Sequence, residues 1–159
     1  MSPGNSPLPE VRLLYKIIEM KSIYSIAATS TGGRNGHVTT DHQLIDADLG
    51  LPRALGGIDD LHLTPEAFFA AGYASCFDNA LMHVIRLERI KTGPAVVSAK
   101  VDLLLSDINR LQIAVELKVE LPGIDYTGAK DLVAKAHEIC PYSNAVRGNI
   151  EVKIIVINS

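Results

Sequence analysis

Residues 64–77 read TPEAFFAAGYASCF, and this stretch decides the fold. Thr64 supplies a hydroxyl N-cap, Pro65 suits the first helical position, and Glu66 faces the positive end of the helix dipole. These signals predict a helix that runs to about Lys91, just before a glycine-proline pair. Its first half is apolar almost all round and rich in small residues, so we expect this helix to be buried on every face.

Two strands, a shorter helix and a last strand follow this segment. Alternate positions from Val97 to Leu105 and from Leu111 to Leu121 are apolar. This period of two predicts half-buried antiparallel strands. An amphipathic pattern predicts a helix from Thr127 to about Ile139, and the final strand is expected over Ile150 to Ile157.

Upstream of residue 64, short β-rich runs are separated by glycines. The runs 22–31 and 37–43 flank Gly32-Gly33-Arg34-Asn35-Gly36, which predicts a β-hairpin. Residues 41–49 are expected to add a third short strand, and residues 52–63 have the composition of an exposed loop. The order of elements predicts one α+β domain over residues 20–159, with helices on one side of a largely antiparallel sheet. Residues 1–19 are expected to form a loosely ordered extension.

The composition narrows the class of protein. The chain has 159 residues, a formal charge of −3 and a pI near 5.9. No cluster of Lys or Arg offers a surface for nucleic acid, and the most apolar stretch, residues 67–77, is too short to span a membrane. The mean hydropathy of +0.18 is high for a small monomer, so we expect a second subunit to cover apolar surface.

The cysteine content excludes two further classes of protein. Two cysteines are too few for a disulfide-stapled secreted scaffold or for a structural zinc site. The N-terminal residues lack the shape of a secretory signal, so the expected location is the cytoplasm, and no bound metal or cofactor is expected. What remains for Cys76 and Cys140 is either thiol chemistry or inert packing.

A reactive Cys76 would need help to ionise. Only a small fraction of an ordinary cysteine is thiolate at neutral pH. Cys76 lies about three turns inside the predicted helix, too far from the helix N-terminus for the dipole to act on it. A cation is therefore required. Arg34, presented by the glycine-rich turn, is a candidate, and if buried it would need an anionic partner.

Several motifs follow one another along the chain, at residues 28–36, 55–57, 64–77, 115–119 and 136–149, and the last of these contains Cys-Pro-Tyr-Ser-Asn. In content and order these motifs resemble the organic hydroperoxide resistance (Ohr) proteins of the Ohr/OsmC superfamily of thiol peroxidases. The resemblance implies an intertwined homodimer with an OsmC/Ohr-like fold around a long buried central helix. It also implies an antioxidant enzyme of the oxidative stress response. Such an enzyme reduces organic hydroperoxides and is itself reduced by a lipoyl dithiol, either dihydrolipoamide or a lipoylated protein.

The resemblance assigns roles to four residues. Cys76 matches the peroxide-attacking cysteine and Cys140 the resolving one, which implies a Cys76 sulfenic acid followed by a Cys76–Cys140 disulfide. Arg34 and Glu66 match the arginine and the glutamate that activate the thiolate. Glu66 would hold the guanidinium of Arg34 through a bidentate pair.

Helix geometry constrains where Glu66 acts. Glu66 and Cys76 are ten residues apart on one predicted helix, which separates them by about 15 Å along its axis. One chain's Glu66 therefore cannot reach its own Cys76. If both act at one site, we expect Glu66 to come from the partner subunit, with the two long helices antiparallel at the dimer core.

Apolar residues near Cys76 indicate the class of substrate. Phe69, Phe77, Leu81 and Tyr142 predict a pocket for alkyl, aryl or fatty-acid hydroperoxides. A pocket of this composition would favour those substrates over hydrogen peroxide. Each of the four residues also suits ordinary core packing.

Two other functions stay open on the residues alone. A cysteine hydrolase would need a histidine base. His83 lies about two turns after Cys76, and His137 lies near Cys140. A non-catalytic binder of small apolar ligands would instead keep both cysteines inert.

Overall fold

The computed structural model describes residues 20–157, so the predicted extension over residues 1–19 lies outside the described residues. It contains six strands and three α-helices, in an order that confirms the predicted α+β class. In chain order these are β1 (Ala28–Thr31), β2 (His37–Thr40), β3 (Asp46–Asp48), α1 (Pro65–Glu88), β4 (Val96–Leu105), β5 (Leu111–Glu120), α2 (Tyr126–Ile139), α3 (Pro141–Val146) and β6 (Val152–Ile157). None of the helices within residues 20–157 has the length and apolar character needed to cross a membrane.

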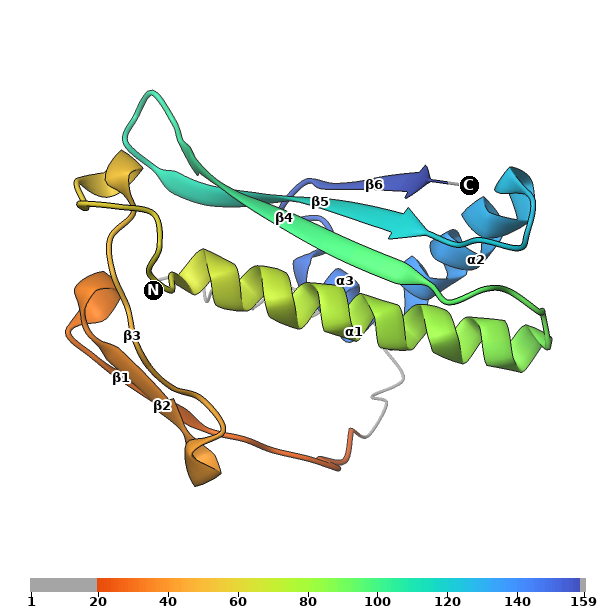
Figure 1. Ribbon diagram of the computed structural model, residues 1–159, viewed down its shortest axis with the longest axis horizontal. Helices are drawn as coiled ribbons and strands as arrows, with labels where there is room; N and C mark the ends of the chain where they lie inside the picture. The colour runs from red at the N-terminus through yellow and green to blue at the C-terminus, as the bar shows by residue number, and fades with distance from the viewer. Residues whose placement is uncertain (1–19, 158–159) are drawn as a thin grey trace, which may run out of the picture.

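The larger sheet has the strand order β4-β5-β6, and α1 packs against β4 while α2 packs against β6 (Figure 1). The central strand β5 pairs antiparallel with β4 and parallel with β6. The predicted alternation is confirmed, because Val115, Leu117 and Val119 all point into the core. Leu105 and Leu111 share that pattern but are exposed at the end of the β4–β5 hairpin. The helices of residues 20–157, α1 to α3, leave that end of the sheet uncovered.

Helix α1 begins as predicted. The Thr64 hydroxyl accepts a hydrogen bond from the backbone N–H of Ala67 at 3.2 Å, and Pro65 occupies the first turn. The helix ends at Glu88 rather than near Lys91, because Arg89 adopts a left-handed conformation with φ of 55°. Its N–H then bonds back to the carbonyl groups of the last turn, which is a common way to close a helix.

The expectation that α1 is buried on every face is wrong for the single chain. One stripe is buried, and it consists of Tyr73, Phe77, Ala80, Leu81, Val84 and Ile85. Ala67, Ala71 and Ser75, on another face of the first half, are exposed. One sheet and two short helices can cover only one side of a helix of 24 residues.

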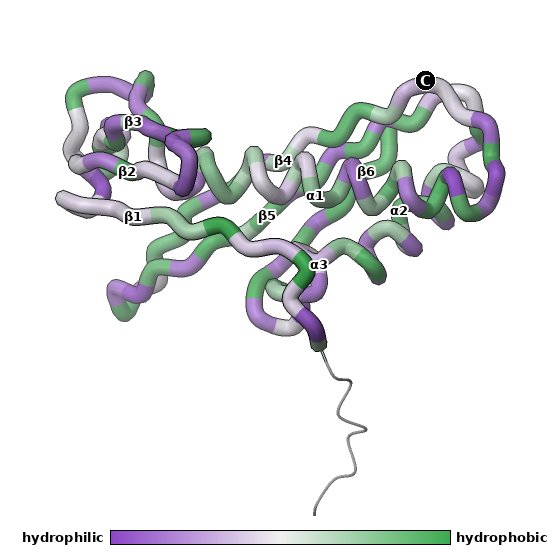
Figure 2. Tube along the Cα trace, turned by 90° about the horizontal axis from the view of Figure 1, so that it is seen from below, coloured by the Kyte–Doolittle hydropathy of each residue, from purple (hydrophilic) through white to green (hydrophobic). Residues whose placement is uncertain are grey.

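The first sheet, β1-β2-β3, stands apart from the larger sheet near the N-terminal end of α1 (Figures 1 and 2). Its hairpin confirms the predicted turn, although the strands are shorter than the runs of β-branched residues. These strands contact mainly one another. Between them and the start of α1 lies an apolar groove of about 390 Å³, lined in part by Val38, Ile45 and Phe68.

Helix α3 is an element that the sequence pattern did not predict. Asp125 caps α2, which starts one residue earlier than expected. Cys140 ends α2 and is at the same time the N-cap of α3, with Pro141 in the first helical turn. Arg147 follows α3 and donates from Nη2 to the carbonyl oxygen of His137 at 2.8 Å, which ties the two helices together. Cys140 is therefore held at a bend between two helices.

Candidate active site

The two cysteines, 64 residues apart in sequence, meet in the fold. Cys76 lies on α1 and is half-buried, whereas Cys140 lies at the bend between α2 and α3 and is fully buried. Both are free thiols, with their Sγ atoms 3.7 Å apart. A disulfide bond is about 2.05 Å long. A small rotation of the side chains would therefore allow the two sulfurs to bond.

The surroundings of Cys76 within one chain do not favour the thiolate. Burial is the main influence and raises the pKa of the Cys76 thiol, and the Cys140 thiol adds to that increase. A backbone hydrogen bond from Tyr142, in the first turn of α3, acts in the opposite direction and lowers the pKa. Since burial dominates, activation of this thiol requires a positive group, and residues 20–157 of its own chain place none beside it.

Arg34 and Glu66 form the bidentate pair that the sequence predicted, and they do so within one chain. Arg34 donates from Nη1 to Oε2 of Glu66 at 2.8 Å and from Nη2 to Oε1 at 2.5 Å. Both side chains are largely buried, with 33% and 17% of their surface exposed. The hydrogen bonds from Arg34 hold the pKa of the Glu66 carboxyl below its ordinary value, and the pKa of Arg34 is raised in turn.

A tight glycine-rich turn presents Arg34 to Glu66. Residues Gly33–Asn35 form a single 3-10 turn, and Gly32 before it has a φ of 76° that favours glycine. A Cβ on Gly36 would lie 1.9 Å from the carbonyl oxygen of Thr31, so no larger residue fits there. The turn therefore directs the guanidinium toward the first turn of α1.

Within one chain Arg34 does not lie against Cys76, so its role in activating the thiol stays a prediction. No hydrogen bond or ion pair joins the two among the described residues, and Arg34 is not among the groups that shift the pKa of Cys76. Arg34 follows Glu66 to the start of α1, ten residues before Cys76, or about 15 Å away along the helix axis. The physical reason is the strength of a bidentate guanidinium–carboxylate pair, which fixes both partners together.

The Arg34–Glu66 pair predicts a pH dependence of stability. The pKa of Glu66 is lowered in the folded state, so its contribution is present above the unfolded value, about 4.3, and is lost as the pH falls through the folded pKa. We expect the difference in free energy of unfolding between the native protein and Glu66→Gln to shrink as the pH falls from about 6 to about 3, because this range spans the pKa of about 4.3 of a glutamate in the unfolded chain. Urea unfolding at each pH measures this difference. A gap that stays constant would contradict the prediction.

The four residues predicted to form the substrate pocket divide into two groups. Phe69 and Tyr142 stack with ring centroids 6.0 Å apart, and Tyr73 contacts both rings. Phe77 and Leu81 have no exposed surface in the single chain and belong to its core. Packing therefore accounts for Phe77 and Leu81, and their part in binding a substrate stays a prediction. Tyr73 is an aromatic neighbour that the sequence reasoning missed.

A buried polar network lies next to the two cysteines. The hydroxyl groups of Tyr73 and Ser143 are 2.9 Å apart, and Nδ1 of His137 lies 2.9 Å from the same Ser143 oxygen. His137, a candidate base for a hydrolase, is thus bonded to Ser143, whereas His83 is exposed on α1. Sequence reasoning missed Ser143, although it lies three residues after Cys140, on the adjacent helix.

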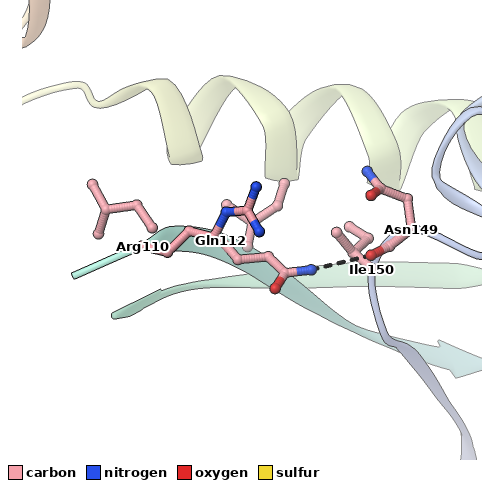
Figure 3. A pocket seen from close by; sticks show the side chains of 6 residues that line it. Arg110, Gln112, Asn149 and Ile150 are labelled. Carbon is pink, nitrogen blue, oxygen red and sulfur yellow. Dashed lines mark hydrogen bonds between the residues drawn. The ribbon is translucent and has the colours of Figure 1, made fainter. Parts of the chain in front are cut away.

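One concave site lies apart from these residues. Figure 3 shows a pocket of about 410 Å³ at the start of β5, where Gln112 donates to the carbonyl oxygen of Asn149 at 3.1 Å. None of the predicted site residues lines it. Among residues 20–157, no group of three or more His, Cys, Asp or Glu side chains is arranged to hold a metal ion.

Sequence comparison identifies the family. The sequence profile described as OsmC-like protein matches residues 58–155. The organic hydroperoxide resistance protein of Xanthomonas axonopodis pv. citri is 42% identical over 135 residues, which cover 84% of this chain and 94% of that protein. The chain belongs to the Ohr branch of the OsmC-like family. OhrB of Bacillus subtilis is another Ohr relative, 37% identical over 134 residues, or 84% of this chain and 97% of that one.

Solved Ohr structures share the fold. The organic hydroperoxide resistance protein of Elizabethkingia anophelis has a TM-score of 0.84 at 48% identity, and the match covers 88% of this chain and 100% of that one. The OhrB structure from Bacillus subtilis has a TM-score of 0.77 at 37% identity and covers 86% of this chain and 100% of that one. The resemblance predicted from the sequence motifs is therefore confirmed.

Proposed function

We propose that this protein is a cysteine-based peroxidase that reduces organic hydroperoxides to alcohols. The observation that carries the proposal is the 3.7 Å separation of Cys76 Sγ and Cys140 Sγ, with one thiol half-buried and the other fully buried. Ohr relatives are named for resistance to organic hydroperoxides, which supports the class of substrate. A thiol pair at this distance provides a nucleophile and a second thiol that resolves its oxidised form.

In the first step the Cys76 thiolate attacks the distal oxygen of the hydroperoxide. The sulfur–oxygen bond forms as the oxygen–oxygen bond breaks, so the sulfur is oxidised to a sulfenic acid and the peroxide is reduced. The alkoxide leaves and takes a proton from solvent to become the alcohol. A guanidinium near the reacting oxygens stabilises the negative charge that develops on the alkoxide.

We propose that this guanidinium is the partner subunit's Arg34 in a homodimer. Within one chain the Arg34–Glu66 pair is fixed at the start of α1, while no cation of the described part of the chain acts on Cys76. The exposed small residues of α1, the exposed hairpin end and the apolar groove beside the first sheet all leave apolar surface that a second copy would cover. Antiparallel packing of two α1 helices would bring each Arg34–Glu66 pair toward the other chain's Cys76.

In the second step Cys140 resolves the oxidised Cys76. The Cys140 sulfur attacks the Cys76 sulfur, hydroxide leaves, and the proton lost by Cys140 completes a molecule of water.

The disulfide is then opened by an external dithiol through a mixed disulfide, which restores both thiols and oxidises the dithiol to a cyclic disulfide. We propose a lipoyl dithiol as the reductant, supplied as dihydrolipoamide or on a lipoylated protein. A cytoplasmic location likewise stays a prediction.

The apolar substrates are expected to approach along aromatic residues. Phe69 and Tyr142 are partly exposed, unlike Phe77, and stack next to Tyr73, one turn before Cys76 on α1. Close packing fixes this stack, because a Cβ on Gly72 would lie 2.7 Å from the Tyr142 hydroxyl. Such a surface favours alkyl and aryl hydroperoxides over hydrogen peroxide.

The test is a coupled assay in which dihydrolipoamide oxidation is followed with cumene, tert-butyl and fatty-acid hydroperoxides and with hydrogen peroxide. The proposal expects turnover with the organic hydroperoxides and weak turnover with hydrogen peroxide. A cysteine hydrolase would instead cleave a chromogenic ester without consuming peroxide. A non-catalytic binder would do neither, and both of its thiols would alkylate slowly even at mildly alkaline pH.

Replacing Cys140 by serine should separate the two steps. The first oxidation of Cys76 should proceed at close to its native rate, because Cys140 is not the nucleophile. Recycling by dithiols should stall, with a sulfenic acid trapped at Cys76 and detected by mass spectrometry after reaction with dimedone. Continued turnover at the native rate would show that the reaction does not pass through a Cys76–Cys140 disulfide.

A further inference from the structure

A network of three polar side chains, two of them completely buried and the third half-buried, adjoins the thiol pair. Ser143 and Tyr73 are completely buried, and the Ser143 hydroxyl lies 2.9 Å from both the Tyr73 hydroxyl and Nδ1 of His137. The network joins α1, the end of α2 and α3. Buried hydroxyl groups are stable only when they are hydrogen-bonded, so these contacts restrain where the three helices lie.

Each member of the network lies one helical turn from a cysteine. Tyr73 precedes Cys76 by three residues on α1. His137 precedes Cys140 by three residues at the end of α2, and Ser143 follows Cys140 by three residues in α3. The Tyr73–Ser143 hydrogen bond therefore ties the segment that carries Cys140 to the turn of α1 that carries Cys76.

The protonation states of the three groups give every hydrogen bond of the network one donor and one acceptor. Burial and then the charge of Arg147 lower the pKa of His137, so its imidazole is neutral at neutral pH and has one nitrogen that accepts a hydrogen bond. Burial raises the pKa of Tyr73, which keeps its hydroxyl protonated. Tyr73 can then donate to Ser143 while Ser143 donates to Nδ1 of His137, and all three groups are satisfied.

We propose that the network of Tyr73, Ser143 and His137 positions Cys140 for attack on the Cys76 sulfur. This rests on the proposed function, in which Cys140 resolves the oxidised Cys76. Cys140 sits in extended backbone at a bend, and the helix that follows it has only six residues, so the local backbone alone does not fix its sulfur. Attack on a sulfur also needs close approach in a defined direction, and a misplacement of about 1 Å can slow a reaction about 100-fold.

The position of Cys140 can be measured without any peroxide. The chromogenic disulfide dithiobis(nitrobenzoate) reacts with Cys76 and releases one thionitrobenzoate. Cys140 then attacks the Cys76 mixed disulfide and releases a second one, forming the Cys76–Cys140 disulfide. The first release reports the reactivity of Cys76. The second reports how readily Cys140 attacks the Cys76 sulfur, which depends on the placement and the ionisation of Cys140 and not on the access of the reagent to Cys76.

For Ser143→Ala and Tyr73→Phe we expect the second release to slow by about 10- to 100-fold, with the first release within about twofold of native. The double variant Tyr73→Phe/Ser143→Ala removes both hydroxyl groups and leaves fewer buried groups unpaired, so it guards against misfolding of Ser143→Ala. Ser75→Ala is the matched control, because within residues 20–157 the Ser75 hydroxyl donates to carbonyl oxygens of its own helix, those of Ala71 and Gly72. This control should keep the native rate of both releases.

A second release at the native rate in all three network variants would overturn the inference. Equal slowing of both releases would also overturn it, since that is the result of a purely structural role. The same variants mixed with cumene hydroperoxide should accumulate the Cys76 sulfenic acid. If native protein consumes no hydroperoxide yet the second release slows in the variants, the proposed function fails while the positioning role stands.

Discussion

Serine at position 76 should abolish the consumption of organic hydroperoxides, with a loss of about 1,000-fold or more. A serine hydroxyl is almost the same size as the thiol but does not ionise near neutral pH, so it cannot attack the peroxide oxygen. Cys76 is only half-buried, and serine is slightly smaller than cysteine, so the substitution introduces no clash and should leave the fold intact. The measurement is the disappearance of cumene hydroperoxide in the presence of excess dihydrolipoamide.

Cys140→Ser is the control for this substitution. This substitution removes the other sulfur of the Cys76–Cys140 contact, but the variant should still reduce one equivalent of hydroperoxide rapidly. Hydroperoxide consumption by Cys76→Ser at more than a few per cent of the native rate would show that Cys76 is not the nucleophile.

Removal of the guanidinium by Arg34→Ala should slow the peroxide step by about 100- to 1,000-fold at neutral pH. Burial already raises the pKa of the Cys76 thiol within one chain. Without a cation the thiol should therefore titrate above its ordinary range, and the fraction of thiolate at neutral pH should fall. The rate of the peroxide step and the rate of alkylation of Cys76 should both shift to higher pH. Rapid mixing with hydroperoxide and with iodoacetamide over a pH series measures the two shifts.

Two variants sharpen the test of Arg34. Arg34→Lys keeps the charge but loses the planar bidentate geometry that holds Glu66, so partial activity is expected. Arg86→Ala removes an exposed arginine from the last turn of α1 and should behave like the native protein. An unchanged pH profile for Arg34→Ala would remove Arg34 from the activation of the thiol.

Local signals in the sequence predicted most of the fold. Thr64 and Pro65 marked the start of α1, and the period of two over β4 and β5 identified the core face of the larger sheet. Such signals depend on neighbouring residues and on burial, which one sequence carries. They did not predict α3, because its six residues are too few for a helical period to show. The all-round apolar character of α1 indicated buried faces but not which chain covers them.

The site was predictable in its parts but not in its arrangement. The motifs indicated Cys76, Cys140, Arg34 and Glu66, and helix geometry alone showed that Glu66 and Cys76 of one chain are too far apart. The bidentate contact keeps Arg34 with its own Glu66 rather than beside its own Cys76. Which group the Arg34 guanidinium contacts depends on the three-dimensional positions of the side chains around it, and the spacing of residues along the chain does not give those positions. The contact of Tyr73 with Ser143 was hidden for the same reason, since 70 residues separate them.

The most direct measurement of the proposed chemistry is a titration of the fully reduced protein with cumene hydroperoxide. One equivalent of hydroperoxide per chain should yield one equivalent of the alcohol. It should also remove both free thiols. Peptide mapping should show Cys76 joined to Cys140, and the unreduced, denatured protein should keep the mass of a single chain. If both thiols stay free while the hydroperoxide persists, or if the oxidised product links cysteines of different chains, the proposed mechanism is wrong.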